Sequence, residues 1–280
     1  MTTINKTWLI TGCSSGLGRA QAEEVLKKGY NAVITSRKVQ DVQSLADQYP
    51  ETALALALDI TDQEQITTVI QQAEARFGRI DVLMNNAGYG YRAAVEEGDD
   101  EDVRNLFDTL FFGTVNMIKS VLPGMRSRKS GTILVVSSIG GRFSQPASGY
   151  YSAAKFALEG MSDALRKEVA PLGIRTIVIE PGAFRTDFAG RSLQGAKTEI
   201  ADYAETVGPR RKENDKSHGT QPGDPQKAAR TIIEITESEK IPFRLLLGSD
   251  AIQTITKELD AQKQELEDWK GVSLTTDYEQ

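Results

Sequence analysis

The chain has 280 residues, a net charge of −6, 39% hydrophobic residues and 26% charged residues, a balance typical of a soluble globular protein. The acidic balance argues against a nucleic-acid-binding protein, whose surface normally carries a basic field. One cysteine, Cys13, and one histidine, His218, can form neither an intrachain disulfide nor a Cys/His zinc site. Because no carboxylate cluster suggests magnesium either, we expect no metal site.

The first residues contain no basic segment that is followed by an apolar run and a cleavage site. No window of the sequence approaches the roughly 20 apolar residues of a membrane span. We therefore expect a cytoplasmic protein that does not enter the membrane.

Short apolar runs alternate with longer periodic segments along the chain. The segment 53–59 is ambiguous, since alanine and leucine favour a helix whereas its shortness and its flanks favour a buried strand. The predicted strands are 7–11, 31–36, 53–59, 79–86, 131–138, 174–181 and 243–248. The predicted helices are 17–29, 39–49, 62–78, 99–126, 149–170, 224–239 and 250–269.

This alternation predicts an α/β fold, a three-layer doubly wound parallel sheet with helices on both faces. The pattern runs without a linker from residue 7 to residue 181, so a single domain over 1–280 is expected. The polar segment 182–225 is long for a connection, which is typical of a functional lid or a disordered piece. We expect a substrate lid at about 183–222 and a peripheral C-terminal helix at about 250–269.

The turn at 11–18, TGCSSGLG, joins the first strand to the first helix. Gly12 can take the tight turn, while Gly16 and Gly18 let the backbone approach a phosphate. The N-terminus of the following helix offers free N–H groups and a partial positive charge, which suit a pyrophosphate. Three glycines could form only a turn, but the position between strand and helix favours a nucleotide site. The other cofactor-binding residues expected in this turn are Ser14, Ser15 and Leu17.

The end of the second strand meets the adenosine ribose in dinucleotide sites, where an acid prefers NAD and an arginine suits the 2′-phosphate of NADP. Here the chain has Ser36 and Arg37, followed by Lys38, and no acid. The sequence therefore predicts that NADP(H) is preferred over NAD(H). The alternative is that Arg37 is only a solvated arginine at a strand end.

Two adjacent tyrosines precede a lysine in the helix at 149–170. Tyr151 and Lys155 are four residues apart and share a helix face, whereas Tyr150 and Lys155 are five apart and diverge. An ammonium beside a phenol favours the phenolate and lowers its pKa. Such a pair can also arise incidentally on a helix surface. A catalytic role for Tyr151 and Lys155 therefore needs support from other motifs in the chain.

Together these motifs resemble the short-chain dehydrogenase/reductase family, in its single-domain, non-extended branch. The resemblance covers 7–190 and 224–250 and implies a Rossmann-type fold. More loosely, NNAGYG and IEPGAFRTDFAG are similar to bacterial reductases near the hydroxysteroid and retinol dehydrogenase group. The matching positions are Thr11, Gly12, Gly16 and Gly18; Asn85, Asn86, Ala87 and Gly88; Ser138, Tyr151 and Lys155; and Pro181, Gly182 and Thr186.

The resemblance implies an NADP(H)-dependent oxidoreductase that transfers a hydride between the nicotinamide and a ketone, an aldehyde or a secondary alcohol. It implies that Tyr151 is the general acid/base, that Lys155 lowers its pKa and bonds the nicotinamide ribose, and that Ser138 holds the substrate oxygen. As alternatives, Ser138 could cap a strand end, Asn85 and Asn86 could be turn residues, and Asp59 could cap a helix. The further cofactor residues that it implies are Asn86, Ala87, Gly88, Asp59 near the adenine, Ile60, Pro181, Gly182 and Thr186.

Two other functions compete with a reductase. A non-catalytic NADP(H)-binding sensor could use the same pocket, although the intact Ser138, Tyr151 and Lys155 argue against it. A sugar-nucleotide epimerase or dehydratase needs a larger C-terminal domain than the roughly 100 residues after the sixth strand.

We expect a small-molecule carbonyl or alcohol substrate, whose pocket is lined by 89–97, 139–149 and 183–222. Aromatic residues in these segments favour an apolar or aromatic substrate, unless they only pack the lid. They are Tyr89, Tyr91, Phe143, Phe184 and Phe188.

The resemblance implies a homodimer or homotetramer joined through the helices at 99–126 and 149–170. More apolar residues crowd the first of these helices than one face needs, namely Leu106, Phe107, Leu110, Phe111 and Phe112.

One position in this helix departs from the family. Three residues before Gly113 the family usually has an asparagine, which the resemblance implies holds a water on the catalytic lysine, but here the residue is Leu110. Because leucine offers neither donor nor acceptor, another group or a backbone carbonyl holds the water, or the relay is absent. Alternatively, Leu110 only fills the core.

Overall fold

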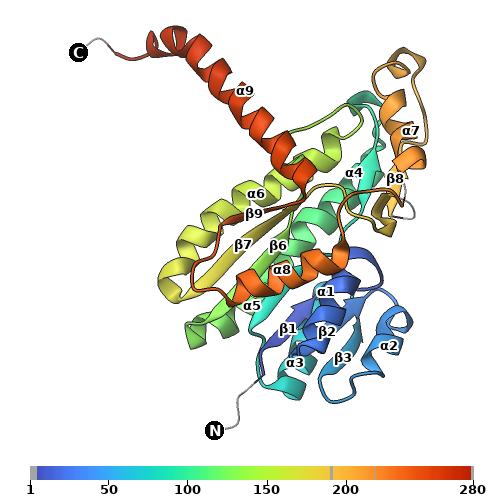
Figure 1. Cartoon of the computed structure of the whole chain (residues 1–280), viewed down its shortest axis with the longest axis vertical. Coiled ribbons are helices and arrows are strands. Elements are labelled where there is room, and N and C mark those ends of the chain that lie inside the picture. The colour runs from blue at the N-terminus through green and yellow to red at the C-terminus, as the bar shows by residue number, and fades with distance from the viewer. Residues whose placement is uncertain (1–4, 190–191, 218, 279–280) are drawn as a thin grey trace.

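A seven-stranded parallel sheet covered by helices on both faces forms the body of the protein in this computed structural model, which describes residues 5–189, 192–217 and 219–278 (Figure 1). This order confirms the predicted doubly wound, Rossmann-type sheet. His218 and residues 190–191 of the predicted lid lie outside the described residues. In spatial order the strands are β3 (Ala53–Ala57), β2 (Asn31–Ser36), β1 (Thr7–Ile10), β4 (Val82–Asn85), β6 (Gly131–Val136), β7 (Ile174–Pro181) and β9 (Arg244–Leu247).

The side chains of the strands alternate between two apolar cores, one on each face of the sheet. In β1, Trp8 and Ile10 pack in one core and Leu9 packs in the other, as the two-residue period of a strand requires. Burial on both faces explains why the strands read as continuous apolar runs. The helices of the first core are α1 (Gly16–Lys27), α2 (Gln40–Ala46) and α8 (Pro225–Glu237). The helices of the second core are α3 (Gln63–Phe77), α5 (Thr114–Arg128) and α6 (Gly149–Val169).

The chain changes direction across the sheet at β1, which pairs with β2 on one side and with β4 on the other. In open α/β sheets such a switch point leaves a crevice at the carboxyl ends of the strands. Here the switch point brings the turns that follow β1 and β4 side by side, so a ligand is expected at these two turns.

The long helix predicted at 99–126 is present, but it contains a π-helical turn. The structure has α4 (Asp100–Phe107), a π-helical turn η2 (Asp108–Gly113) and then α5. The hydroxyl of Thr114 donates to the carbonyl of Leu110 at 2.9 Å, and a side-chain bond of this kind competes with the regular backbone ladder. Gly113 lies against Ile60, where a Cβ would be only 2.8 Å from Ile60 Cγ1, so this tight approach requires glycine.

The segment 183–222 is more ordered than a long polar connection suggests. Its short strand β8 (Leu193–Gly195) pairs in parallel with β5 (Gly90–Arg92), and the sequence pattern predicted neither strand. This small second sheet ties the lid to the segment that follows β4. The lid also contains η5 (Asp187–Ala189), η6 (Ala201–Tyr203) and α7 (Gly208–Ser217). The remaining short turns are η1 (Val95–Glu97), η3 (Ile139–Gly141) and η4 (Ala170–Leu172).

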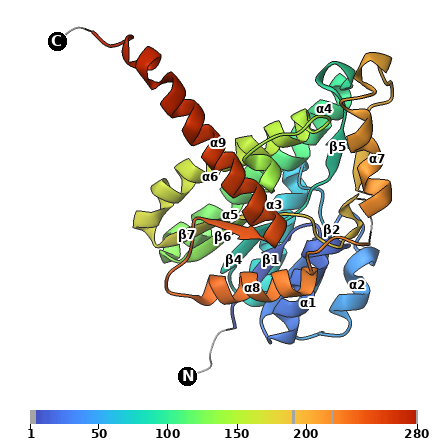
Figure 2. The ribbon, with the colours of Figure 1, turned by 45° about the horizontal axis from the view of Figure 1, so that its top comes forward.

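The C-terminal helix α9 (Ser249–Leu274) is longer than the predicted 250–269 and extends away from the body in both views (Figures 1 and 2). Within the described residues, no helix combines the length and the apolar character needed to cross a membrane.

Candidate active site

The turn after β1 forms a close-packed cradle at the switch point. Gly12 has a φ of +72°, and a Cβ there would lie 2.8 Å from the Cα of Ala87. A Cβ on Gly18 would collide with the amide of Asn86 and the carbonyl of Gly12. A side chain at either glycine would therefore push apart the turns after β1 and β4.

The side chain of Asn86 hydrogen-bonds to the backbone of the turn after β1. Its amide donates to the carbonyls of Thr11 at 2.9 Å and Gly12 at 3.1 Å. The hydroxyl of Thr11 in turn accepts from the backbone N–H groups of Asn86 and Ala87, each at 3.0 Å. These bonds support the alternative that Asn86 is a turn residue, because its side chain joins the turn after β4 to the turn after β1.

The N-terminus of α1 is available to an anion. Ser15, the N-cap residue, is extended, and its side chain makes no capping hydrogen bond within the described part of the chain. Thr186 approaches from the loop after β7 and lies 3.4 Å from the position of a Cβ on Gly16. An uncapped helix N-terminus between glycines and a hydroxyl fits the pyrophosphate of a dinucleotide.

At the carboxyl end of the neighbouring strand, Arg37 is exposed just beyond β2. Its charge reaches Tyr89, where it opposes the burial that raises the pKa of that phenol. Asp59 follows β3, and its carboxylate accepts from the backbone N–H and the hydroxyl of Thr61 at 2.9 and 2.7 Å. The N-cap of α3 is Asp62, so the alternative that Asp59 caps this helix is wrong.

The three predicted catalytic residues meet at one end of α6. Ser138 follows β6, its Oγ accepts from the N–H of Gly140 at 3.0 Å, and its side chain hydrogen-bonds Tyr151. Lys155 lies one turn further along the helix, with its Nζ 5.7 Å from the centroid of the Tyr151 ring. The structure therefore brings together the three residues that the sequence selected.

The neighbouring Tyr150 faces a different part of the molecule. Its hydroxyl donates to the carbonyl of Val95 at 2.5 Å, and its ring packs on Gly98, where any Cβ would collide with it. The hydroxyl of Tyr150 is thus used to hold the loop before α4, which leaves Tyr151 as the phenol beside Ser138.

The pKa of Tyr151 does not shift in the direction that the sequence predicts. Burial raises the pKa of Tyr151, while the hydrogen bond from Ser138 and the positive charge of Arg92 oppose this shift. Burial also lowers the pKa of Lys155 to about 8, against the charge of Glu159, and its ammonium donates to the carbonyl of Val136 at 2.9 Å. In the protein alone the pKa of Tyr151 therefore moves in the opposite direction to the one predicted from Lys155.

Hydrogen bonds to the end of β9 and the start of α9 hold the loop after β7 in place. Pro181 ends the strand, and the N–H of Gly182 donates to the carbonyl of Leu247 at 2.9 Å. The carboxylate of Asp250 accepts from the N–H of Ala183 at 2.7 Å and fills the space where Gly182 would carry a side chain. This arrangement positions Thr186 over the glycine turn.

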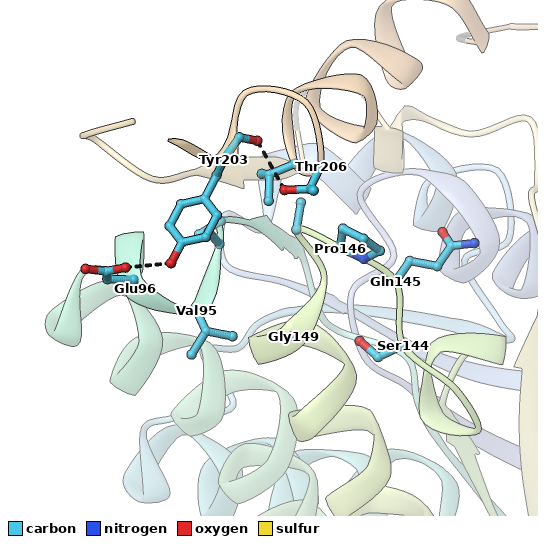
Figure 3. Close-up of a pocket in the computed structure, with 12 residues that line it drawn as sticks. Val95, Glu96, Ser144, Gln145, Pro146, Gly149, Tyr203 and Thr206 are labelled. Atoms are coloured by element: carbon cyan, nitrogen blue, oxygen red, sulfur yellow. Dashed lines mark hydrogen bonds between the residues drawn. The ribbon is translucent and has the colours of Figure 1, made fainter. Parts of the chain in front are cut away.

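A cavity of about 390 Å³ opens beside the start of α6 (Figure 3). Tyr203 of the lid closes one side, and its hydroxyl donates to the carboxylate of Glu96 at 2.5 Å. The three segments that line the cavity fall within those predicted from the sequence. The lining residues are Ala93, Ala94, Val95, Glu96, Ser144, Gln145, Pro146, Ala147, Gly149, Tyr203, Thr206 and Val207.

The aromatic residues predicted to line the pocket are absent from this described lining. Tyr91 is buried in the core and its hydroxyl accepts from the N–H of Asp99, so it does not line this cavity. Phe184 packs against the first core and Gly223. The ring of Phe188 lies near that of Tyr151, with centroids 6.0 Å apart.

Comparison with known proteins decides the family. The model of the short chain dehydrogenase family matches residues 6–197 of this chain, which include the glycine turn, Ser138, Tyr151, Lys155 and Thr186.

The chain belongs to the short-chain dehydrogenase family.

This short-chain dehydrogenase has curated relatives along most of its length. It is 39% identical over 274 residues to the oxidoreductase BOA17 of Botryotinia fuckeliana, covering 98% of this chain and 100% of that protein. It is 37% identical over 243 residues to the 3-ketodihydrosphingosine reductase of Bacteroides thetaiotaomicron, covering 86% of this chain and 87% of that protein. The chain is therefore an oxidoreductase of the NAD(P)-dependent dehydrogenase/reductase type, with a small-molecule substrate.

Solved structures agree with this assignment. A short-chain dehydrogenase from Streptomyces avermitilis shares 43% identity and a TM-score of 0.93, covering 99% of this chain and 100% of that chain. One from Burkholderia cenocepacia in complex with NADP shares 25% identity and a TM-score of 0.73, covering 95% and 97%. The fold is also shared with a Burkholderia phymatum protein in complex with NAD, at 19% identity and a TM-score of 0.80, covering 94% and 97%. A nicotinamide cofactor follows for this short-chain dehydrogenase.

Sequence reasoning missed several residues that shape the site of this short-chain dehydrogenase. The charge of Arg92 acts on Tyr151, and Asp250 anchors the loop of Thr186. Glu97 accepts from the N–H groups of Ala94 and Ile200, both at 2.8 Å, and forms an ion pair with Arg211 of the lid. None of these residues belongs to a motif. Apart from the local bond between Glu97 and Ala94, their contacts join segments that are distant in the sequence.

Proposed function

We propose that this protein is an NADP(H)-dependent carbonyl reductase that uses Tyr151 as its general acid. The observation that carries this proposal is the meeting of Ser138, Tyr151 and Lys155 at the start of α6, at the edge of a cradle that fits a dinucleotide. The reverse oxidation of a secondary alcohol uses the same groups.

The glycine turn and Thr186 would hold the pyrophosphate, and Lys155 would bond the nicotinamide ribose. When bound, the cofactor supplies the hydride that the carbonyl carbon accepts. Ser138 holds the carbonyl oxygen by a hydrogen bond, and Tyr151 donates a proton to that oxygen. Burial raises the pKa of Tyr151, which keeps the phenol protonated at neutral pH, as reduction requires.

The preference for NADP(H) rests on the residues that end β2. Arg37 is exposed there, Lys38 adds a second positive charge, and the segment carries no acid for a ribose hydroxyl. An arginine suits the dianionic 2′-phosphate because its guanidinium can donate two parallel hydrogen bonds.

The substrate that we propose is an apolar ketone or aldehyde. Three alanines, Val95, Pro146 and Val207 make up half of the residues that line the cavity beside α6, and Phe188 lies against the ring of Tyr151. The Bacteroides relative is named for a ketone substrate, which agrees with a reductase. The outer cavity would hold the chain of the substrate while its carbonyl reaches Tyr151.

The test is the consumption of NADPH, followed by its absorbance, with a panel of aliphatic and aromatic ketones and aldehydes. We expect turnover with apolar carbonyls and the reverse reaction with the matching alcohols. Binding of NADPH without turnover across the panel would contradict the proposal and favour the sensor.

We infer in addition a cytoplasmic, single-domain enzyme that forms a dimer or a tetramer. Phe112 in the π-helical turn and Phe156 on α6 are 52% and 46% exposed, which supports a contact between subunits on this side. Sedimentation at micromolar concentration tests this inference, and a monomer would refute it.

A further inference from the structure

The second half of α9 has no support from the body of the protein. Ala251 and Ile255 are buried, but every residue from Leu259 to Tyr278 is exposed. Figures 1 and 2 both show the helix running outward from the sheet. Isolated helices shorter than about 12–15 residues are marginal in water, and most helical stability in proteins comes from packing an apolar face.

The exposed half is also apolar along one line. Leu259 is 48% exposed, Leu266 is 63% exposed and Trp269 is 61% exposed. These side chains continue a seven-residue repeat that starts where the helix still touches the body. Position a of the repeat holds Ile252, Leu259, Leu266 and Ser273, and position d holds Ile255, Gln262 and Trp269. A repeat of seven with apolar a and d positions is typical of a helix that packs along a second helix.

Charges of opposite sign flank this seam. Glu258 and Glu265 occupy the g positions, and Lys263 and Lys270 occupy the e positions. In a parallel pair, each g residue lies beside the e residue five positions later on the other helix, so both glutamates face lysines. In an antiparallel pair, g faces g and e faces e, which would place like charges together.

We propose that α9 packs in parallel and in register against α9 of a second copy of this chain, through the seam at 259–273. The apolar a and d side chains supply the buried surface, and Glu258 and Glu265 pair with Lys263 and Lys270 of the other copy. The polar Gln262 at a d position favours the register in which it meets itself. The seam shares no residue with the exposed pair Phe112 and Phe156.

The charge of the helix argues against a membrane as the occupant. Between Lys257 and Lys270 the acidic residues outnumber the lysines. A helix that lies on an anionic lipid surface is rich in lysine and arginine on its polar face. A second copy instead places Lys263 and Lys270 opposite Glu258 and Glu265, so the seam fits another copy of this chain.

The first test is the particle mass from sedimentation velocity at micromolar concentration. We expect Leu266→Glu to halve the mass. A wild-type dimer would become a monomer, and a wild-type tetramer that also associates through a second face would become a dimer. The matched control is Gln264→Glu, on the opposite side of the same helix, which should keep the wild-type mass. Both side chains are exposed in the single copy, and circular dichroism verifies the fold. A wild-type monomer, or an unchanged mass for Leu266→Glu, would overturn the proposal.

The charge pattern provides a second test. The variant Glu258→Lys/Glu265→Lys and the variant Lys263→Glu/Lys270→Glu should each fail to associate through α9. An equimolar mixture of the two should regain the wild-type mass, because each lysine then faces a glutamate. If the mixture stays at half the mass, the proposed pairing is wrong.

A cysteine reports the orientation. The native Cys13 is buried, and burial raises its pKa to about 12, so it does not compete in oxidation. Ser273→Cys, near the tip of the helix, should form a disulfide between two copies in a parallel pair, whereas Gln264→Cys should not. Failure of Ser273→Cys to crosslink under mild oxidation would contradict the parallel arrangement.

Discussion

The side chain of Leu110 fills the space above Gly88, where a Cβ would lie 2.7 Å from Leu110 Cδ2. Leu110 belongs to the π-helical turn, and Gly88 ends the Asn-Asn-Ala-Gly run beside the glycine turn. An apolar residue thus contacts the turn after β4 at the position where the family usually has an asparagine. Leu110 is 1% exposed, so this contact belongs to the core.

We predict that Leu110→Asn raises turnover, because the amide restores a group that can hold a water for proton return to Lys155. The variant should also be less stable, since a buried amide without partners costs roughly 1–3 kcal/mol. The measurement is the single-turnover and steady-state rate across pH, with Leu110→Met as the apolar control. If the folded, NADPH-binding variant is no faster than the parent at any pH, the missing relay does not limit this enzyme.

Tyr151→Phe should lower turnover by about 10²–10⁴-fold or more, because it removes the proton donor and keeps the ring. NADPH affinity, measured by fluorescence titration, should change little. The matched control is Tyr150→Phe, whose lost hydroxyl binds only the carbonyl of Val95 in the described structure. Loss of activity in the control instead would show that the assignment of the two tyrosines is reversed.

Arg37→Asp should shift the preference from NADPH toward NADH. A hydrogen bond to a charged group contributes about 1.5–3 kcal/mol, which is roughly tenfold to more than a hundredfold. The quantity to measure is the ratio of kcat/KM with the two cofactors. Arg126→Asp is the control, since this exposed arginine lies in the last turn of α5, which leads to the amino end of β6. An unchanged ratio for Arg37→Asp would remove this residue from the 2′-phosphate.

Lys155 should make the stability of the cofactor-free protein depend on pH. Its pKa falls from 10.5 to about 8 on burial, so the unfolded chain binds more protons between these values. Stability attributable to this group therefore rises with pH from about 8 to about 10.5, and below pH 8 the buried charge costs on the order of 3 kcal/mol.

We thus expect Lys155→Met to be more stable than the parent at pH 7, with the difference shrinking toward pH 10. Urea unfolding at several pH values measures the difference. Lys167→Met is the control, because Lys167 lies on the same helix but is exposed and pairs with Asp163. A difference that does not vary with pH would show that burial does not shift the pKa of Lys155.

Glu97→Gln should loosen the lid. The anion of Glu97 binds Arg211 and two N–H groups, and these partners hold its pKa below the ordinary value despite burial. Lid anchoring is therefore full above the ordinary pKa and is lost as the pH falls through the lowered value. At pH 7 we expect faster proteolysis within the lid of the variant and a higher KM for the carbonyl, with Glu101→Gln, an exposed residue of α4, as the control. Equal cleavage rates would contradict this anchor.

The sequence by itself determined the sheet and the local geometry of the proposed catalytic pair. Strands buried on both faces appear as short apolar runs, and a helix places Tyr151 and Lys155 on one face through local backbone geometry alone. The glycines of 11–18 mark positions where another group approaches the backbone closely. Such a position excludes a side chain whichever group approaches it, so the glycine is visible in the sequence. These features depend on neighbours in the sequence, which is why their pattern is visible there.

Only the tertiary structure decided the features that depend on distant segments. Gly113 of the π-helical turn packs closely on Ile60, and the lid is ordered because β8 pairs with β5 and Glu97 binds Arg211. The raised pKa of Tyr151 follows from burial by the fold, which opposes the effect expected from the nearby lysine. Burial and pairing between distant segments are properties of the packed chain, so residue spacing could not reveal them.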